Sequence, residues 1–126
     1  MTLEVMKVAD QINARIKRLE ELCGQLDEAG QRKADAIANY DVSLAVAMAK
    51  LTRGRISQIE GETLPDSIPA TAAEKYAKGV CTKERAELEV ATAGYKSLLT
   101  KIEVLMCTIN SKQSIMRHLS HEVSSM

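Results

Sequence analysis

The sequence predicts an all-α protein, a long antiparallel helical hairpin of the coiled-coil type that assembles into a helical bundle. Three observations predict it. Apolar residues recur at alternating spacings of four and three along two runs of similar length. Both prolines, Pro65 and Pro69, lie between these runs. The chain has three Tyr but no Trp and no Phe, so its apolar residues suit helix seams better than a thick globular core.

The first run predicts helix one over about residues 3–53, with two columns of mainly apolar residues at heptad spacing. The columns are Ala9, Ile16, Cys23, Gly30, Ile37, Leu44 and Leu51, and Val5, Ile12, Leu19, Leu26, Lys33, Tyr40 and Ala47. Gly30 and Lys33 interrupt the pattern. This flaw leaves open a helix end within residues 26–33, which would give three helices in place of two.

Residues 54–70 are expected to form an elbow between the helices. Pro65 and Pro69 disfavour a single continuous helix, because proline lacks a backbone N–H and clashes with the preceding turn. Thr71 stands three residues before Glu74, which is the spacing of a capping box. The sequence therefore predicts that helix two begins at Thr71 and continues to about residue 122.

The second run repeats the heptad spacing over residues 77–123. Its columns are Cys81, Leu88, Tyr95, Ile102, Ile109, Met116 and Val123, and Ala77, Glu84, Ala91, Leu98, Leu105, Lys112 and Leu119. An antiparallel register in which facing residue numbers sum to about 128 places the columns of the two helices opposite each other, with Val5 facing Val123. Registers shifted by seven residues satisfy the same pattern.

Composition narrows the class of protein. A length of 126 residues favours a single domain, and 17 basic residues balance 17 acidic ones, so no overall charge attracts nucleic acid or an anionic membrane. No apolar run approaches the roughly 18 residues of a transmembrane helix. Asp10 and Arg15 come too early for a signal peptide, and the three cysteines show no CxxC spacing. We therefore expect a cytoplasmic protein without membrane contact.

Motifs of catalysis or metal binding are weak. The sequence contains no GxSxG turn and no phosphate-binding loop. His118 and His121 stand close enough on a helix to share a metal ion, with Glu122 adjacent, but zinc needs three or four ligands and no second pair is evident. We expect no catalytic residue, no metal site and no cofactor, and hence a protein that is not an enzyme.

Apolar residues outside the heptad columns indicate a second interface, because they make the apolar stripe wider than a narrow two-helix seam. The other interpretation is that their long side chains cover the edges of the first seam. On the first interpretation, the surface would bind another copy of the chain, with a dimer favoured, and a protein partner. The residues expected to carry it are Leu22, Met48, Leu99, Met106 and Ile115.

Basic residues gather at the elbow end of the predicted hairpin, where they are candidates for contact with nucleic acid phosphates. They are Lys50, Arg53, Arg55, Lys75 and Lys78. Nearby acidic residues dilute this charge, and no aromatic platform is present on which single-stranded bases would stack. Nucleic acid is therefore the alternative partner.

The segment "PATAAEKYAKGVCTKERAELEVATAGYKSLLTKIEVLMCTINSKQSI" resembles small helical proteins of phages and prophages. The likeness lies in a helix that starts at Thr, a "KG" soon after, an "A…YK" step and an "IN..QS"-like end. The segment "AIANYDVSLAVAMAKL" adds to it. The resemblance implies a protein of a phage early region, near genes for single-strand annealing or binding, in the cytoplasm of a bacterial host. It implies a scaffold or interaction protein, with a DNA-binding accessory of recombination or replication as the alternative, and it carries over no catalytic residue.

Overall fold

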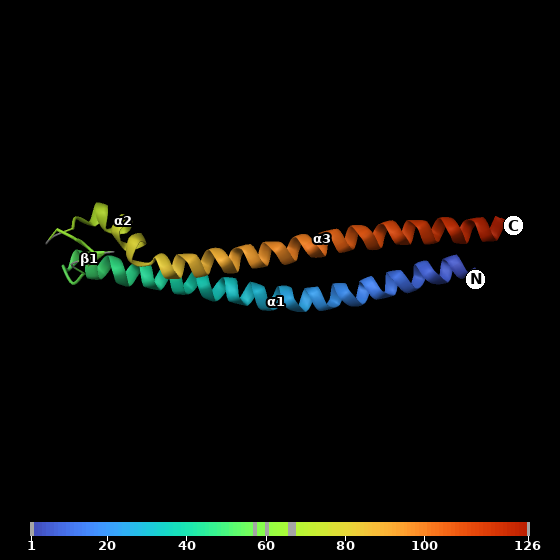
Figure 1. Ribbon diagram of the computed structural model, residues 1–126, viewed down its shortest axis with the longest axis horizontal. Helices are drawn as coiled ribbons and strands as arrows, with labels where there is room; N and C mark the ends of the chain where they lie inside the picture. The colour runs from blue at the N-terminus through green and yellow to red at the C-terminus, as the bar shows by residue number, and fades with distance from the viewer. Residues whose placement is uncertain (1, 57, 60, 66–67, 126) are drawn as a thin grey trace. The chain divides into compact units, whose positions relative to one another are not determined.

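The computed structural model describes residues 2–56, 58–59, 61–65 and 68–125 and shows an all-α helical hairpin (Figure 1). The elements in chain order are α1 (Leu3–Thr52), β1 (Gln58–Ile59), β2 (Glu62–Thr63), α2 (Ala70–Val80) and α3 (Thr82–Ser125). This confirms the predicted fold class. The chain divides into two compact units, which we call the two-helix unit (Met1–Ala29 with Tyr95–Met126) and the elbow unit (Gly30–Gly94).

In the two-helix unit, α1 and α3 are the only elements among the described residues, so each helix must be covered by the other. Val5 and Ile12 of α1 are buried, as are Ile102 and Ile109 of α3. All four belong to the predicted heptad columns. Complete burial of such a side chain contributes about 1.5–3 kcal/mol, and this seam is therefore the main source of stability in the unit.

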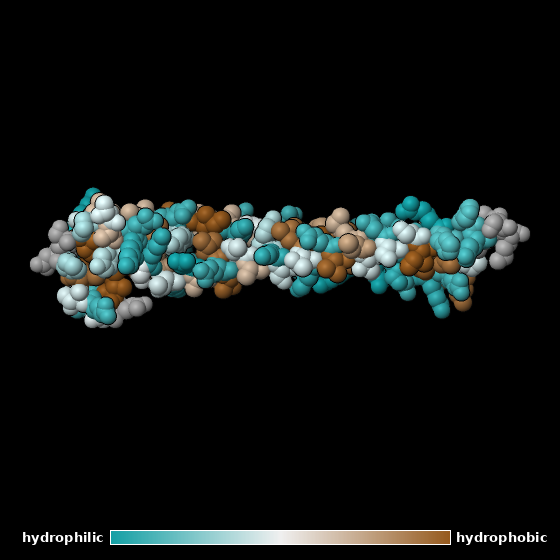
Figure 2. Space-filling model, turned by 90° about the horizontal axis from the view of Figure 1, so that it is seen from above, coloured by the Kyte–Doolittle hydropathy of each residue, from teal (hydrophilic) through white to brown (hydrophobic). Residues whose placement is uncertain are grey.

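The columns predicted for helix two are confirmed. Every member whose side chain is described is buried or half-buried, including the charged residues Glu84 and Lys112. The expected contact between Val5 and Val123 involves a side chain outside the described residues. On the outward face, Figure 2 shows separate hydrophobic patches between hydrophilic residues. The seam thus buries one face of α3, and the other faces are in contact with solvent.

One of the two columns predicted for α1 is displaced by a single position between Ile16 and Ile37 but is correct at Leu51, which is fully buried. Leu22 and Ala29 are buried, at 4% and 8% exposure, whereas Cys23 is exposed. Ile16 and Ile37, both expected in the seam, are exposed at 37% and 41%. The column that starts at Val5 is correct. The two alternative second columns lie on either side of it around the helix, and both are equally near a facing helix. The pair Leu22 and Ala29 offers more apolar surface than Cys23 and Gly30, which favours the observed side.

α1 continues without interruption through residues 26–33, so the alternative of a helix end there is wrong. The helix ends instead at Thr52, followed by Gly54 at φ 68°, a left-handed conformation that suits glycine. The Gly54 N–H donates to the Leu51 carbonyl at 3.1 Å, and the Arg55 N–H donates to the Lys50 carbonyl at 2.9 Å. These two bonds form a Schellman cap, which satisfies carbonyls that the helix itself leaves free.

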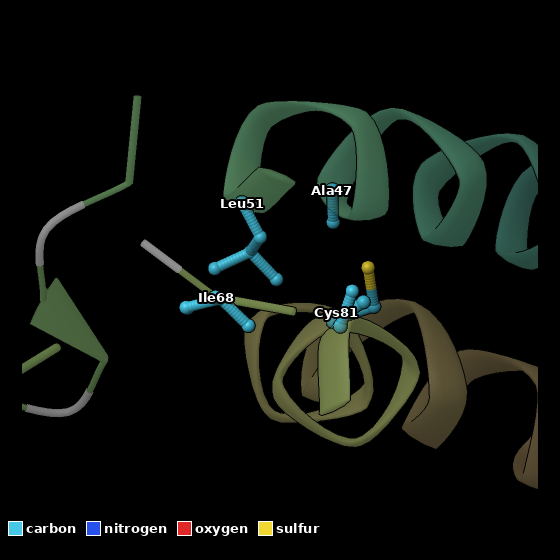
Figure 3. Close-up of a cluster of buried hydrophobic side chains, with 6 residues drawn as sticks. Ala47, Leu51, Ile68 and Cys81 are labelled. Atoms are coloured by element: carbon cyan, nitrogen blue, oxygen red, sulfur yellow. The ribbon is translucent and has the colours of Figure 1, made fainter. Parts of the chain in front are cut away.

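The core of the elbow unit is a cluster of small and medium apolar side chains (Figure 3). α1 contributes Ala47 and Leu51, and Figure 3 shows Leu51 directed towards Ile68 and Ala47 towards Cys81. Ala73 and Ala77 of α2 belong to the same cluster and are fully buried, at 0% exposure. Because these side chains are short, α2 can pack close to α1. The facing of Ala47 and Cys81 agrees with the expected register.

The capping box predicted for Thr71 and Glu74 is wrong. α2 begins at Ala70, with Pro69 as its N-cap and no capping bond from a side chain. The N–H groups of Ala72 and Ala73 donate to the Pro69 carbonyl at 2.9 and 3.1 Å. Glu74 instead pairs with Lys78, Oε1 to Nζ, at 3.3 Å. Proline suits this position because its fixed φ, here −64°, prepares the chain to enter the helix.

The single second helix expected over residues 71–122 is divided in the structure. α2 ends at Val80 and α3 begins at Thr82, with Cys81 between them at φ −96° and ψ 29°. The Cys81 N–H still donates to the Ala77 carbonyl, and the Cys81 carbonyl still accepts from the Arg85 N–H, both at 3.0 Å. The break is therefore a local change of direction. Gly79, a poor helix former, lies two residues before it.

The elbow contains a short antiparallel ladder that sequence reasoning missed. Gln58 pairs with Thr63 and Ile59 pairs with Glu62. Gly61 stands in the connecting turn at φ 82°, where a side chain would be strained. Ile59 packs partly against the core cluster, and its Cγ2 lies 3.5 Å from the position of a Cβ added at Gly79. The ladder thus lies against α2.

Removal of the Leu51 side chain should destabilise the elbow unit strongly. Leu51 is 0% exposed, and Leu51→Ala would leave a cavity within the core cluster. We expect a loss of about 2–5 kcal/mol in the free energy of unfolding, measured by chemical denaturation followed by circular dichroism. Leu3→Ala is the matched control, because Leu3 is 68% exposed on the same helix and should change stability little. Equal losses in the two variants would contradict the assigned core.

Candidate interaction surface

Among the residues that the structure describes, no three His, Cys, Asp or Glu side chains are grouped so that they could hold a metal ion. His118 forms an ion pair with Glu122 on the same helix, Nε2 to Oε1 at 3.1 Å, and both side chains are exposed. His121 is also exposed. The two histidines therefore lie on an open helix surface, and the surface features that remain are apolar and charged ones.

The three cysteines are free thiols in two kinds of environment. Cys23 and Cys107 are exposed, whereas Cys81 is buried at the junction of α2 and α3. Burial raises the pKa of the Cys81 thiol above its ordinary value, and the neighbouring Glu84 carboxylate raises it further. Both effects disfavour the thiolate, which is the nucleophilic form. Cys81 is thus a packing residue of the core.

The structure separates the five residues predicted for a partner interface. Leu22 is buried at 4% exposure in the seam of the two-helix unit, which corrects its expected place on an outer face. Met48 and Leu99 are half-buried, and Met48 packs against the elbow core. Only Met106 and Ile115 are exposed, at 49% and 44%. The other interpretation, coverage of the first seam, therefore describes Leu22, Met48 and Leu99 better.

Exposed valines form a further set of apolar residues outside the heptad columns. Val90 is 73% exposed, Val42 64%, Val104 61% and Val46 48%. None belongs to a heptad column, and valine has a lower helix propensity than Lys, Arg, Glu or Gln because its branched side chain loses rotamer freedom. The choice of valine at these non-column positions is visible in the sequence itself.

The elbow unit contains an apolar groove of about 240 Å³, which we call the elbow groove. Its lining is Val42, Ser43, Val46, Ala47, Lys50, Ile56, Val80, Cys81 and Glu84. Val42, Val46 and Val80 are each more than a third exposed. The lining combines apolar side chains with one cation and one anion. Such a surface suits another polypeptide better than a nucleic acid backbone.

The five basic residues predicted to contact nucleic acid all lie in the elbow unit, and all are exposed. Part of their charge is already compensated. Lys78 pairs with Glu74, and the nearby Arg85 pairs with Glu89, Nε to Oε1 at 3.4 Å. Lys75 lines a second hollow of about 380 Å³ together with Glu62. The local field is therefore mixed in sign.

Comparison with known proteins finds no matching protein family, no matching curated protein and no matching solved structure. Within the described part of the chain, none of the helices combines the length and the apolar character needed to cross a membrane. The functional inference therefore depends on the exposed apolar and charged side chains.

Thiol labelling should separate the cysteines. With a thiol reagent under native conditions, Cys23 and Cys107 should react readily, and Cys81 should react at least about tenfold more slowly because it is buried and its pKa is raised. The raised pKa favours the neutral Cys81 thiol in the folded chain. The contribution of Cys81 to the free energy of unfolding should therefore fall as the pH rises above the ordinary pKa of a thiol. Mass spectrometry of labelled peptides over time gives the three rates. Three equal rates would contradict the burial of Cys81.

Proposed function

We infer that the protein is a non-enzymatic α-helical interaction protein, which acts by self-association and by contact with a protein partner. The observation that supports this most directly is the exposure of Val42, Val46, Val90 and Val104 on α1 and α3. Isolated exposed apolar residues are normal on any protein surface. Here the residues are β-branched and stand in helices, and each leaves about half or more of its surface in water in the single chain.

Exposed valines on a helix carry a free-energy cost. An exposed valine in a helix is less favourable than alanine by several tenths of a kcal/mol in propensity, and it leaves apolar surface in water. Val42 and Val46 also border the elbow groove. Burial against another helix would recover about 25 cal/mol for each Å² removed from water. Association with another helix would therefore remove the apolar surface of these valines from water.

The resemblance to phage and prophage proteins supports a further part of the proposal. On this interpretation, the protein acts in the cytoplasm of a bacterial host during phage DNA replication or recombination. Met106 and Ile115 are the exposed remainder of the predicted interface, and we assign them to the protein partner. Both lie on α3 in the two-helix unit.

Self-association is the first test. Light scattering coupled to gel filtration, over a series of protein concentrations, should give a mass that rises from 13.8 kDa towards twice that value. Because the contact is mainly apolar, the rise should persist at high salt, whereas a contact made by charge alone would be lost. A mass of one chain at every concentration would contradict the self-association proposed here.

Nucleic acid binding is the second candidate function, favoured by the exposure of the five basic residues within one unit. If it is correct, the chain should bind a short single-stranded oligonucleotide at low salt. Arg55→Glu with Lys75→Glu should weaken binding and lower the salt slope by about 1.4, because two phosphate contacts to a single strand are lost.

Lys7→Glu with Lys17→Glu is the matched control for charge, since both residues are exposed and lie in the two-helix unit. Fluorescence anisotropy of a labelled oligonucleotide measures all three proteins. Absence of binding by the wild-type chain at low salt would remove nucleic acid as a partner, and equal loss in both variants would indicate attraction by overall charge only.

A further inference from the structure

One exposed face of α1 in the elbow unit carries a regular series of side chains, which we call the docking stripe. In chain order it consists of Asp35, Ala38, Val42, Val46, Ala49 and Arg53, and all six residues are exposed. Successive members are three or four residues apart, so they share one face of the helix. That face is opposite the buried column that includes Ala47, because Ala47 follows Val42 by five residues, about half a turn beyond one full turn.

The last member, Arg53, follows the end of α1 by one residue but keeps the helical position. Its N–H donates to the Ala49 carbonyl at 3.2 Å, so the docking stripe continues to this residue. At the other end, the Asp35 carboxylate accepts a bond from the Gln31 amide, Nε2 to Oδ1 at 2.9 Å. This bond is made along the helix surface, and Asp35 itself stays exposed.

The docking stripe has nearly the same chemistry in both chain directions. From either end it runs as a charged residue, an alanine, a valine, a valine, an alanine and a charged residue. Two things differ: the sign of the end charge, since Asp35 stands at one end and Arg53 at the other, and the position of the alanine, which is four residues from the valine at the first end and three at the second. Two copies that face each other with opposite directions therefore present valine to valine, alanine to alanine and anion to cation. This is the self-complementarity that a two-fold interface requires.

We propose that a second copy of this chain docks on the docking stripe, antiparallel, so that Val42 of each copy packs against Val46 of the other. This inference rests on the proposed function and names the surface that self-association uses. Ala38 then faces Ala49 of the second copy, and Asp35 pairs with Arg53 of the second copy at both ends. The alanines keep the helix axes close, since short side chains do not hold the backbones apart.

The occupant is a second copy because of this charge arrangement. An unrelated partner helix would need only an apolar face, and nothing in it would require opposite charges at equal distances from the centre of the docking stripe. Asp35 and Arg53 stand at matching distances, seven residues outside Val42 and Val46 respectively. A second copy in the reverse direction supplies both complementary ion pairs from these same two residues.

The elbow groove adds apolar surface beside the docking stripe. Val42 and Val46 belong to both, and Ile56 and Val80 continue the apolar lining. The docking stripe is about 27 Å long and about 10 Å wide, which gives roughly 300 Å² for each copy. Even with the walls of the groove, this is less than the roughly 800 Å² per partner of a standard stable interface. The dimer is therefore weak, and its population depends on the protein concentration.

The test is an exchange of charges in the full-length chain, with dimerisation measured by analytical ultracentrifugation. Asp35→Arg and Arg53→Asp should each weaken the dimer about tenfold, because each turns both end pairs into repulsions. The double variant D35R/R53D restores opposite charges at both ends and should return to within about threefold of the wild-type affinity. An equimolar mixture of the two single variants should form a heterodimer that is tighter than either homodimer, since one copy then carries both cations and the other both anions.

The apolar part of the interface has its own matched control. Val42→Lys with Val46→Lys should abolish dimerisation, whereas Leu3→Lys should not affect it, because Leu3 has nearly the same exposure, 68% against 64% for Val42, but lies in the two-helix unit. All of these positions are exposed, so circular dichroism should show unchanged helix content. The charge and valine variants together test both parts of the docking stripe.

The outcomes separate this inference from the proposed function. A wild-type dimer that survives V42K/V46K at full affinity, or single charge variants that the double variant does not rescue, would overturn the docking stripe and leave self-association intact. An L3K variant that is as defective as V42K/V46K would do the same. A wild-type chain that stays monomeric at every concentration would contradict both.

Discussion

The constraint on which the rest of the structure depends is that a helix with a single neighbour can bury only one face. In the two-helix unit this face is the heptad seam that includes Val5 and Ile109, and everything outside it stays in water. Such a seam depends more on the regular spacing of its apolar residues along the helix than on the volume of their side chains. The chain can therefore form it without Phe or Trp. Packing within the chain does not decide which residues stand on the outer faces of the two helices. Those residues are therefore open to selection for function.

The elbow unit meets the constraint differently, because α2 and the short ladder pack on the end of α1. Small side chains such as Ala73 and Ala77 allow close packing, and Leu51 fills the space between them and Ile68. Cys81 changes the direction of the chain from α2 to α3 without losing its backbone hydrogen bonds. The elbow is therefore a packed core. It fixes α1 near its end, where the docking stripe lies on the opposite face.

The hairpin was predictable because a sustained heptad pattern and two prolines each point to the same architecture. The second column of α1 was not, because Leu22 and Cys23 flank the same correct column and spacing alone does not choose between them. The capping box failed for a similar reason: Thr71 and Glu74 have the right spacing, but Pro69 already occupies the N-cap and Glu74 pairs with Lys78. A ladder of two residue pairs is too short to leave a periodic pattern. Of the residues predicted for the interface, Met106 and Ile115 are exposed, whereas Leu22 is buried in the seam.

Self-complementarity explains why the same chain can combine a neutral total charge with a specific contact. Seventeen residues of each sign give no long-range attraction between copies, so recognition has to come from the order of charges along a surface. In the docking stripe, an anion and a cation at opposite ends favour one relative direction and disfavour the parallel one, in which like charges would meet. The two valines supply apolar area without setting direction. Specificity and affinity thus come from different residues of one helix face, and the small area keeps the contact reversible.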